Sequence, residues 1–153
     1  MVPPIAAKIF PKWNAPIDGG LKWRGKRIFG DHKTIRGLMT GVVVGSVVFI
    51  VQKYWWSLID YDYLPIYTGF LMSAGALIGD CVKSFFKRQV GIKSGDSWFP
   101  WDQTDWILGF MLFLWPVYQT PPFEAVKLIL LAVGLHIIVR GIGYGMKIND
   151  KLI

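Results

Sequence analysis

Long segments with little or no charge constrain this chain more than any other feature of its sequence. A helix needs about 20 apolar residues to cross the roughly 30 Å hydrocarbon layer of a membrane. The candidates are residues 37–52, 63–79, 106–123 and 123–146. Apolar residues make up 53% of the chain and its mean hydropathy is positive, as in membrane proteins. We therefore expect an all-α integral membrane protein with about four transmembrane helices, folded as one domain over residues 1–153.

Aromatic residues and prolines mark where these segments end. Residues 54–56 (YWW) follow the first segment directly and indicate an aromatic belt at a membrane surface. Pro116 is expected to bend or stop the third helix, because proline has no backbone N–H to donate. The pair Pro121 and Pro122 closes the same segment.

Glycines recur every four residues in two of the segments. They are Gly37, Gly41 and Gly45 in the first, and Gly75 and Gly79 in the second. Small residues at this spacing let helix backbones approach closely in a membrane. We interpret these glycines as packing positions.

Positive charge is concentrated in two polar segments, residues 1–36 and 87–104. The chain has a net charge of +7. The cations of these segments are Lys8, Lys12, Lys22, Arg24, Lys26, Arg27, Lys33 and Arg36, followed by Lys87, Arg88 and Lys93. An excess of lysine and arginine marks cytoplasmic loops. We therefore expect a multi-pass protein of the cell membrane whose two polar segments face the cytoplasm.

Topology and lipid headgroups could account for these cations by themselves. We interpret Lys22, Arg24, Lys26 and Arg27 in that way, as contacts to headgroups. A non-catalytic basic membrane protein that binds anionic lipid therefore remains an alternative. The aspartates among the cations are not needed for such a role, however, and they point toward chemistry.

Charged residues share one helix face where the second segment ends. If the helix continues past residue 79, then Asp80, Lys83, Ser84 and Lys87 lie at positions i, i+3, i+4 and i+7. Helix capping would explain one aspartate at the start of the third segment. Two aspartates three residues apart, Asp102 and Asp105, together with a third across the loop, look more like ligands of a hard cation such as Mg²⁺.

This mixture of acids and cations suits a substrate that is rich in phosphate. Phosphoryl and nucleotidyl transfer bring two anions together, so such enzymes use Mg²⁺ and basic side chains to offset the repulsion. The sequence shows no Walker A loop, no histidine-rich metal motif and no evident Ser-His-Asp set. Transfer of a nucleotide to a phosphate fits the residues that are present.

Two blocks of the sequence resemble a known family of membrane enzymes. Residues 17–20 (IDGG) and 25–37 (GKRIFGDHKTIRG) resemble the first cytoplasmic segment of the CDP-archaeol synthases. Residues 79–91 (GDCVKSFFKRQVG) and 98–105 (WFPWDQTD) resemble the second. The related CDP-diacylglycerol synthases show a similar series, matched here by Ser84, Lys87, Arg88, Lys93, Asp102 and Asp105.

The resemblance implies a reaction and a set of roles. Such an enzyme transfers CMP from CTP to an unsaturated archaeal ether-lipid phosphate and releases pyrophosphate. Asp80, Asp102 and Asp105 would hold Mg²⁺ as the cofactor, and Lys87 and Arg88 would join them as catalytic residues. The nucleotide and its phosphates would be bound by Asp18, Lys33, Arg36, Lys83, Ser84 and Lys93. The expected partners are CTP, the lipid phosphate and membrane lipids, with no nucleic acid.

The same resemblance leaves two points open. Members of the family usually begin with one more transmembrane helix than this chain, so we expect the chain to be short at its N-terminus. The lipid could also be phosphatidic acid or another lipid phosphate, because the shape of the lipid pocket is not visible in the sequence.

Overall fold

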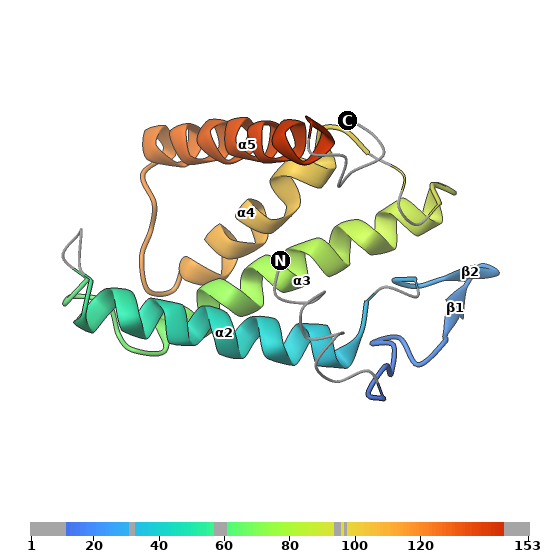
Figure 1. The fold of residues 1–153 in the computed structure, drawn as a ribbon, viewed down its shortest axis with the longest axis horizontal. Coiled ribbons are helices and arrows are strands. Elements are labelled where there is room, and N and C mark those ends of the chain that lie inside the picture. The colour runs from blue at the N-terminus through green and yellow to red at the C-terminus, as the bar shows by residue number, and fades with distance from the viewer. Residues whose placement is uncertain (1–11, 31–32, 57–60, 94–95, 97, 146–153) are drawn as a thin grey trace.

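The structure is a computed structural model that describes residues 12–30, 33–56, 61–93, 96 and 98–145. Within that part of the chain it contains four helices and one small hairpin (Figure 1). The helices are α2 (Ile35–Tyr54), α3 (Thr68–Gln89), α4 (Trp101–Leu114) and α5 (Pro122–Gly145). The strands are β1 (Lys22–Trp23) and β2 (Lys26–Arg27). The expectation of a mostly helical protein with about four helices is confirmed, whereas the hairpin was not predicted.

Two helices, α2 and α3, have the length and hydropathy to cross a membrane, among the described residues. Only 17% and 22% of their most apolar windows are buried inside the protein. The core helix of a soluble protein would be mostly buried, so this exposed apolar surface fits a lipid environment. α2 matches the predicted segment 37–52, and α3 covers the segment 63–79 from residue 68 on and continues past residue 79 as expected.

The ends of α2 and α3 have local causes. The Thr34 hydroxyl accepts a hydrogen bond of 3.2 Å from the N–H of Gly37 and caps the start of α2. α3 starts later than the predicted segment, because the chain turns at Pro65, whose carbonyl accepts the N–H of Thr68. Lys53, in the last turn of α2, donates to the carbonyls of Tyr61 and Leu64 at 2.7 and 3.0 Å, and this ties α2 to the turn before α3.

The prediction for the third span is wrong in its boundaries. That span was expected over residues 106–123, but α4 begins at Trp101 and ends at Leu114. Pro116 stops the helix, and the Leu114 carbonyl instead accepts the N–H groups of Val117 and Tyr118 in a turn. At 1.5 Å per residue α4 is roughly 21 Å long, shorter than the hydrocarbon layer. The fourth segment matches α5, which starts at Pro122, a favoured first position for proline.

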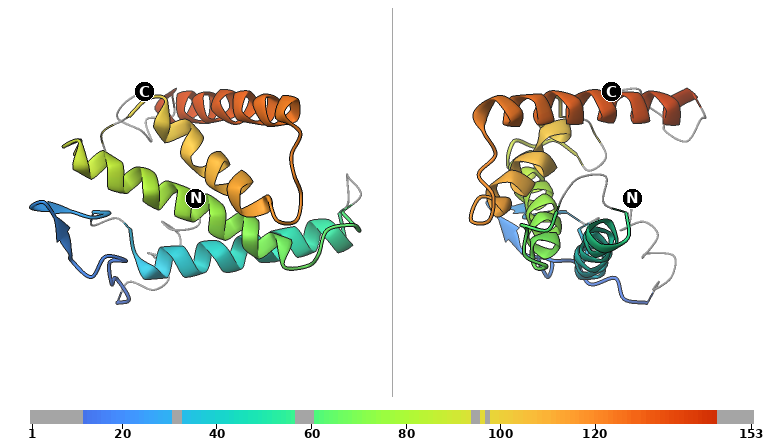
Figure 2. Two further views of the ribbon diagram at one scale, coloured as in Figure 1. Left: turned by 180° about the vertical axis from the view of Figure 1, so that it is seen from behind. Right: turned by 90° about the vertical axis from the view of Figure 1, so that its left-hand side faces the viewer.

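The helices follow one another in space in the order α2, α3, α4 and α5 (Figures 1 and 2). α3 is the central element, because it packs extensively against α4 and also against α2. α5 makes far fewer contacts and packs on α4. The charged end of α3 lies beside the hairpin, as contacts between α3 and β2 also show.

Glycines set the distance between α3 and α4. A side chain at Gly79 would overlap the carbonyl oxygen of Asp105, and one at Gly109 would overlap the carbonyl oxygen of Gly75. A side chain at Gly41 in α2 would similarly overlap the side chain of Leu77. The packing role predicted for glycines in the first two spans is therefore confirmed at these positions, and Gly109 adds the matching position on α4.

A small hairpin folds over the end of α3. Residues Lys22 and Arg27 pair, as do Trp23 and Lys26, so two residues form the turn. These turn residues, Arg24 and Gly25, have φ angles of 51° and 77°, the left-handed conformation that a two-residue hairpin turn requires. Residues 1–11 and 31–32 of the predicted polar segment lie outside the described residues.

Substitution of Gly109 tests the contact between α3 and α4. Gly109→Ala should lower the free energy of unfolding by about 1–3 kcal/mol, because the new methyl group overlaps backbone atoms of α3. Gly134→Ala in α5 is the matched control, since a side chain there meets no atom within 4 Å. Thermal unfolding in detergent measures both. Equal melting temperatures for the two variants would contradict the close contact.

Candidate active site

Lys83 lies at the centre of three carboxylates. Its Nζ is 3.1 Å from Asp80 Oδ1, 3.0 Å from Asp102 Oδ1 and 2.8 Å from Asp105 Oδ2. The Lys83 side chain is 15% exposed and that of Asp105 is 6% exposed. Water screens such charges poorly, so these contacts are stronger than those of surface ion pairs. The three aspartates that the sequence selects therefore converge on one point, from α3 and α4.

Two more lysines hold the outer sides of these carboxylates. Lys33 pairs with Asp80 Oδ2, and the Lys87 Nζ lies 3.0 Å from Asp102 Oδ2. The backbone N–H of Trp98 also donates to Asp102 Oδ2 at 2.6 Å. We call the six side chains the charge cluster: Asp80, Asp102, Asp105, Lys33, Lys83 and Lys87. Three positive and three negative charges make the cluster formally neutral, which reduces the cost of burying it.

Helix periodicity and the glycine contact together build this cluster. Lys83 and Lys87 are one turn apart on the face of α3 that meets α4, while Val82 and Phe86 are about half exposed on another face. Asp105 reaches Lys83 because α4 crosses α3 directly at Gly79. The predicted polar face of α3 is confirmed by these contacts.

The three carboxylates are the kind of ligand that binds magnesium, but their oxygens lie farther from a common centre than magnesium ligands do. Among the described residues, no three acidic, histidine or cysteine side chains are placed so that they could hold a metal ion. The oxygens of Asp80, Asp102 and Asp105 instead surround an ammonium at 2.8–3.1 Å. Magnesium binds oxygen at about 2.0–2.1 Å, so each oxygen would have to move inward by about 1 Å. Three carboxylates are a donor set that fits Mg²⁺ in its chemistry, and the point where their oxygens meet is filled by the Lys83 ammonium.

A second polar site, the basic pocket, lies between the hairpin and the end of α3. Its volume is about 400 Å³. It is lined by Lys26, Arg27, Gly30, Arg88, Gly91, Ile92 and Lys93. Arg88 Nε is buried and has no hydrogen-bond partner among the described residues, although Nη1 donates to the Ile92 carbonyl. An unsatisfied guanidinium N–H in a pocket of cations marks a place for an anion.

Asp18 organises the loop that forms one wall of the basic pocket. Its buried carboxylate accepts hydrogen bonds from Arg27 and from the backbone N–H groups of Gly20 and Phe29, at 2.8–3.1 Å. Burial opposes ionisation of this carboxyl, but the bonds from Arg27 and from the two N–H groups outweigh it. They lower the pKa of Asp18 from 3.8 to about 2.

Ser84 and Arg36, which the sequence also selected, donate hydrogen bonds within the protein. Ser84 is buried and donates to the Asp80 carbonyl at 2.8 Å. Arg36 is buried and donates to Asn14 Oδ1 at 3.2 Å. Of the residues predicted to bind phosphate, Lys33 and Lys83 belong to the charge cluster and Lys93 to the basic pocket.

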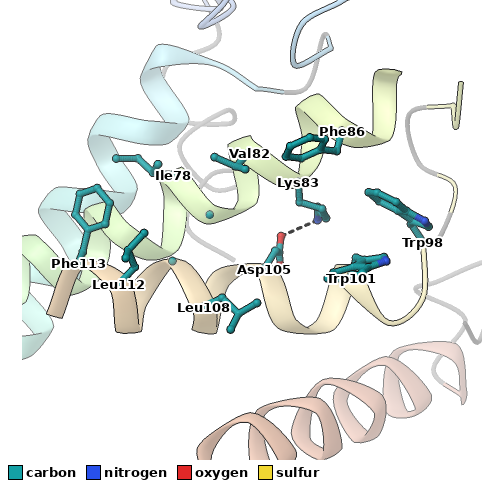
Figure 3. Close-up of a pocket in the computed structure, with 12 residues that line it drawn as sticks. Ile78, Val82, Lys83, Phe86, Trp98, Trp101, Asp105, Leu108, Leu112 and Phe113 are labelled. Carbon is teal, nitrogen blue, oxygen red and sulfur yellow. Dashed lines mark ion pairs between the residues drawn. The ribbon is translucent and has the colours of Figure 1, made fainter. Parts of the chain in front are cut away.

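An apolar groove runs along α3 and α4 past the charge cluster (Figure 3). Its volume is about 490 Å³. Lys83 and Asp105 are its polar residues, and Figure 3 shows their ion pair between Trp98 and Trp101 on one side and Leu112 and Phe113 on the other. An apolar groove with a buried ion pair can hold an amphiphile with its polar group at the cluster.

Sequence reasoning missed two features of the site. Lys26 and Arg27 were interpreted as headgroup contacts, but Lys26 donates to the Gln89 carbonyl at 2.6 Å and both residues line the basic pocket. A turn of Arg24 and Gly25 between short strands was the available signal. Trp98 and Trp101 line the groove, and nothing in their spacing revealed it.

The chain matches a known protein family over almost its entire length. The family model described as "CarS-like: CDP-archaeol synthase" covers residues 2–152. A CDP-archaeol synthase of Methanospirillum hungatei is 41% identical in an alignment of length 145 that covers 88% of this chain and 87% of the relative. One from Pyrococcus furiosus is 35% identical in an alignment of length 138 that covers 86% of this chain and 80% of the relative.

A solved structure supports the same relationship. It belongs to "an intramembrane enzyme for archaeal membrane lipids biosynthesis" and is 30% identical in sequence. The superposition has a TM-score of 0.74 and covers 91% of this chain and 89% of the other. At this identity and coverage the two chains share both their fold and their ancestry.

Acid titration tests the contribution of Asp18. Because the folded pKa of about 2 lies below the ordinary 3.8, the carboxylate stabilises the protein above pH 4. This stabilisation is lost as the pH falls toward 2. Asp18→Asn should therefore be less stable at pH 7 by roughly 2 kcal/mol, and the difference should shrink between pH 4 and pH 2. Chemical unfolding in detergent over this pH range measures it, and a difference independent of pH would contradict the role of the charge.

Proposed function

Because the chain belongs to the CDP-archaeol synthase family, we propose that its charge cluster, basic pocket and apolar groove together carry out the family reaction. The enzyme transfers CMP from CTP to an archaeal ether-lipid phosphate and forms CDP-archaeol for lipid synthesis. The observation that carries our assignment of the site is the convergence of Asp80, Asp102 and Asp105 on one point.

The reaction requires two anionic substrates, CTP and the lipid phosphate, to meet. An oxygen of the lipid phosphate attacks the α-phosphorus of CTP, and the bond from that phosphorus to the oxygen bridging to the β-phosphate breaks. Pyrophosphate leaves with that oxygen and its electron pair. Cations must offset the repulsion between nucleotide and lipid phosphate, and again when pyrophosphate leaves.

We assign magnesium to the three carboxylates of the charge cluster. Asp80, Asp102 and Asp105 would hold it, and when bound there it would polarise the α-phosphate and neutralise the leaving pyrophosphate. Lys87 keeps the Asp102 carboxylate in place through its contact of 3.0 Å, and Lys33 does the same for Asp80. The convergence of the three carboxylates and the burial of Asp102 and Asp105 support this assignment.

We assign the β- and γ-phosphates of CTP to the basic pocket. Arg88 offers its buried Nε, which has no partner in the described part of the chain, and Lys26, Arg27 and Lys93 supply further charge around about 400 Å³ of space. Gly30 and Gly91 line the pocket, and both have a φ of 89°, a conformation that favours glycine. Because they have no side chains, a ligand can approach their backbone closely. Arg27 is held by Asp18, which keeps this wall in shape.

The lipid occupies the apolar groove in this proposal. Its phosphate would lie at Lys83 and Asp105, and its hydrocarbon would extend along Leu108 and Leu112. Both leucines are exposed, at 46% and 71%, so the groove opens toward the surrounding lipid. The chain is then a multi-pass protein of the cell membrane with one membrane-embedded domain, and the basic pocket faces the cytoplasm, where CTP is found.

Removal of the acids tests the magnesium site. Asp102→Asn and Asp105→Asn should each lower kcat by at least about 100-fold while the protein remains folded, because ligands of one ion act as a unit. Glu124→Gln, an exposed acid at the start of α5, is the control and should keep full activity. Pyrophosphate release from CTP and lipid phosphate measures the rate. Mild effects of the two aspartate variants would favour a non-catalytic lipid-binding protein.

Removal of a basic side chain tests the phosphate site. Arg88→Met should raise KM for CTP by about tenfold or more, since the lost contact is a charge-assisted hydrogen bond. Lys22→Met is the matched control, because Lys22 lies on the same hairpin as Lys26 but does not line the pocket.

A second assay of the wild-type enzyme compares an unsaturated ether-lipid phosphate with phosphatidic acid as the substrate. Turnover on phosphatidic acid alone would contradict the assigned lipid.

A further inference from the structure

We propose that Lys83 is an exchangeable counter-ion, whose ammonium occupies the place of the divalent cation in the substrate-free enzyme and moves to a phosphate oxygen when cation and nucleotide bind. This inference rests on the proposed function, which assigns the cation to Asp80, Asp102 and Asp105. That assignment places the cation where the Lys83 ammonium lies, and the inference concerns where this ammonium goes.

The geometry makes Lys83 and a bound cation mutually exclusive. The ammonium contacts one oxygen of each carboxylate at 2.8–3.1 Å, so it occupies the point where the three meet. A cation that shares all three oxygens would lie at the same point. Two positive charges so close to one another would repel strongly in a poorly hydrated site.

Of the three lysines, only Lys83 needs to leave. Lys33 contacts only Asp80 among the cluster carboxylates, and Lys87 only Asp102, as far as the described contacts extend. Both can stay and keep these carboxylates oriented. Asp105 has no second lysine among the described ion pairs, so it depends on the central charge, whether ammonium or metal.

Lys83 also has space into which it can move. It belongs to the cluster and also lines the apolar groove of about 490 Å³, and Figure 3 shows its side chain between Asp105 and Trp98. Its four-carbon stem is flexible and its ammonium carries three donors that can rotate toward a new acceptor. A phosphate oxygen placed beside the cluster is within reach of such a rotation.

The charge balance explains why the exchange would need the nucleotide. The resting cluster is neutral, with three lysines on three aspartates. A divalent cation in place of the ammonium leaves the cluster with a charge of +1 and a displaced lysine beside it. The phosphates of CTP neutralise both. Metal and nucleotide therefore bind cooperatively, and each raises the affinity for the other by the same factor.

Binding of Mn²⁺, a spectroscopic substitute for Mg²⁺, tests this exchange without any turnover. The full chain in detergent is titrated with Mn²⁺ and the free ion is measured by electron paramagnetic resonance, with and without CTP. Lys83→Met should bind Mn²⁺ at least about tenfold more tightly than wild type in the absence of CTP. CTP should raise the affinity of wild type strongly and that of the variant weakly.

Controls separate this role from a structural one. Lys127→Met removes the same charge from an exposed pair with Glu124 and should leave Mn²⁺ binding unchanged. Lys83→Arg keeps the charge and should show no gain in affinity. Lys83→Gln serves as a second neutral variant if Lys83→Met does not fold, and Mn²⁺ should raise its melting temperature more than that of wild type.

Two outcomes would overturn the proposal in different ways. If neutral variants of Lys83 bind Mn²⁺ no better than wild type, Lys83 does not compete with the cation, while the proposed function stands. If binding with CTP is unaffected by Asp102→Asn and Asp105→Asn, the metal site itself is elsewhere and both proposals fail. Tighter binding in Lys83→Met that Asp105→Asn abolishes would support the exchange.

Discussion

The contact between α3 and α4 at their glycines determines the rest of the site. Because Gly79 and Gly109 have no side chains, the two backbones touch at positions one helical turn from Lys83 on α3 and from Asp105 on α4. This distance lets short aspartate side chains on α4 reach a lysine on α3. Larger residues at the crossing would separate the helices and break the contacts of Asp102 and Asp105 with Lys83 and Lys87. The ion pairs between α3 and α4 therefore require the close packing of these helices.

The charge cluster also shows how a membrane protein can keep polar groups at the end of a span. Isolated charges are expensive away from water, but opposite charges in contact offset much of that cost. α3 carries its apolar residues first and its charged residues in its last turns, so one helix joins the lipid region to the polar surface. The basic pocket continues this surface toward the first loop. A reaction between a soluble nucleotide and a lipid phosphate needs such a boundary.

Local sequence patterns predicted much of this arrangement. The helical spacing of Lys83 and Lys87 identified the polar face of α3, and the spacing of Asp102 and Asp105 identified the facing residues of α4. These patterns work because periodicity is a property of single helices. The contacts between Lys83 and all three carboxylates depend on how two helices cross, which no single segment encodes. The sequence suggested that the acids hold a metal and the lysines hold phosphate, whereas in the structure they hold one another.

The proposed binding of the lipid in the groove along α3 and α4 determines how the enzyme would meet its lipid. Because the groove opens sideways past exposed Leu108 and Leu112, a lipid can enter by lateral diffusion without leaving the bilayer. The quantity that sets the encounter rate is then the mole fraction of lipid phosphate in the membrane plane, and not its amount per volume of solution. At a constant CTP concentration, dilution with inert lipid would slow the enzyme, while dilution of the whole suspension would not.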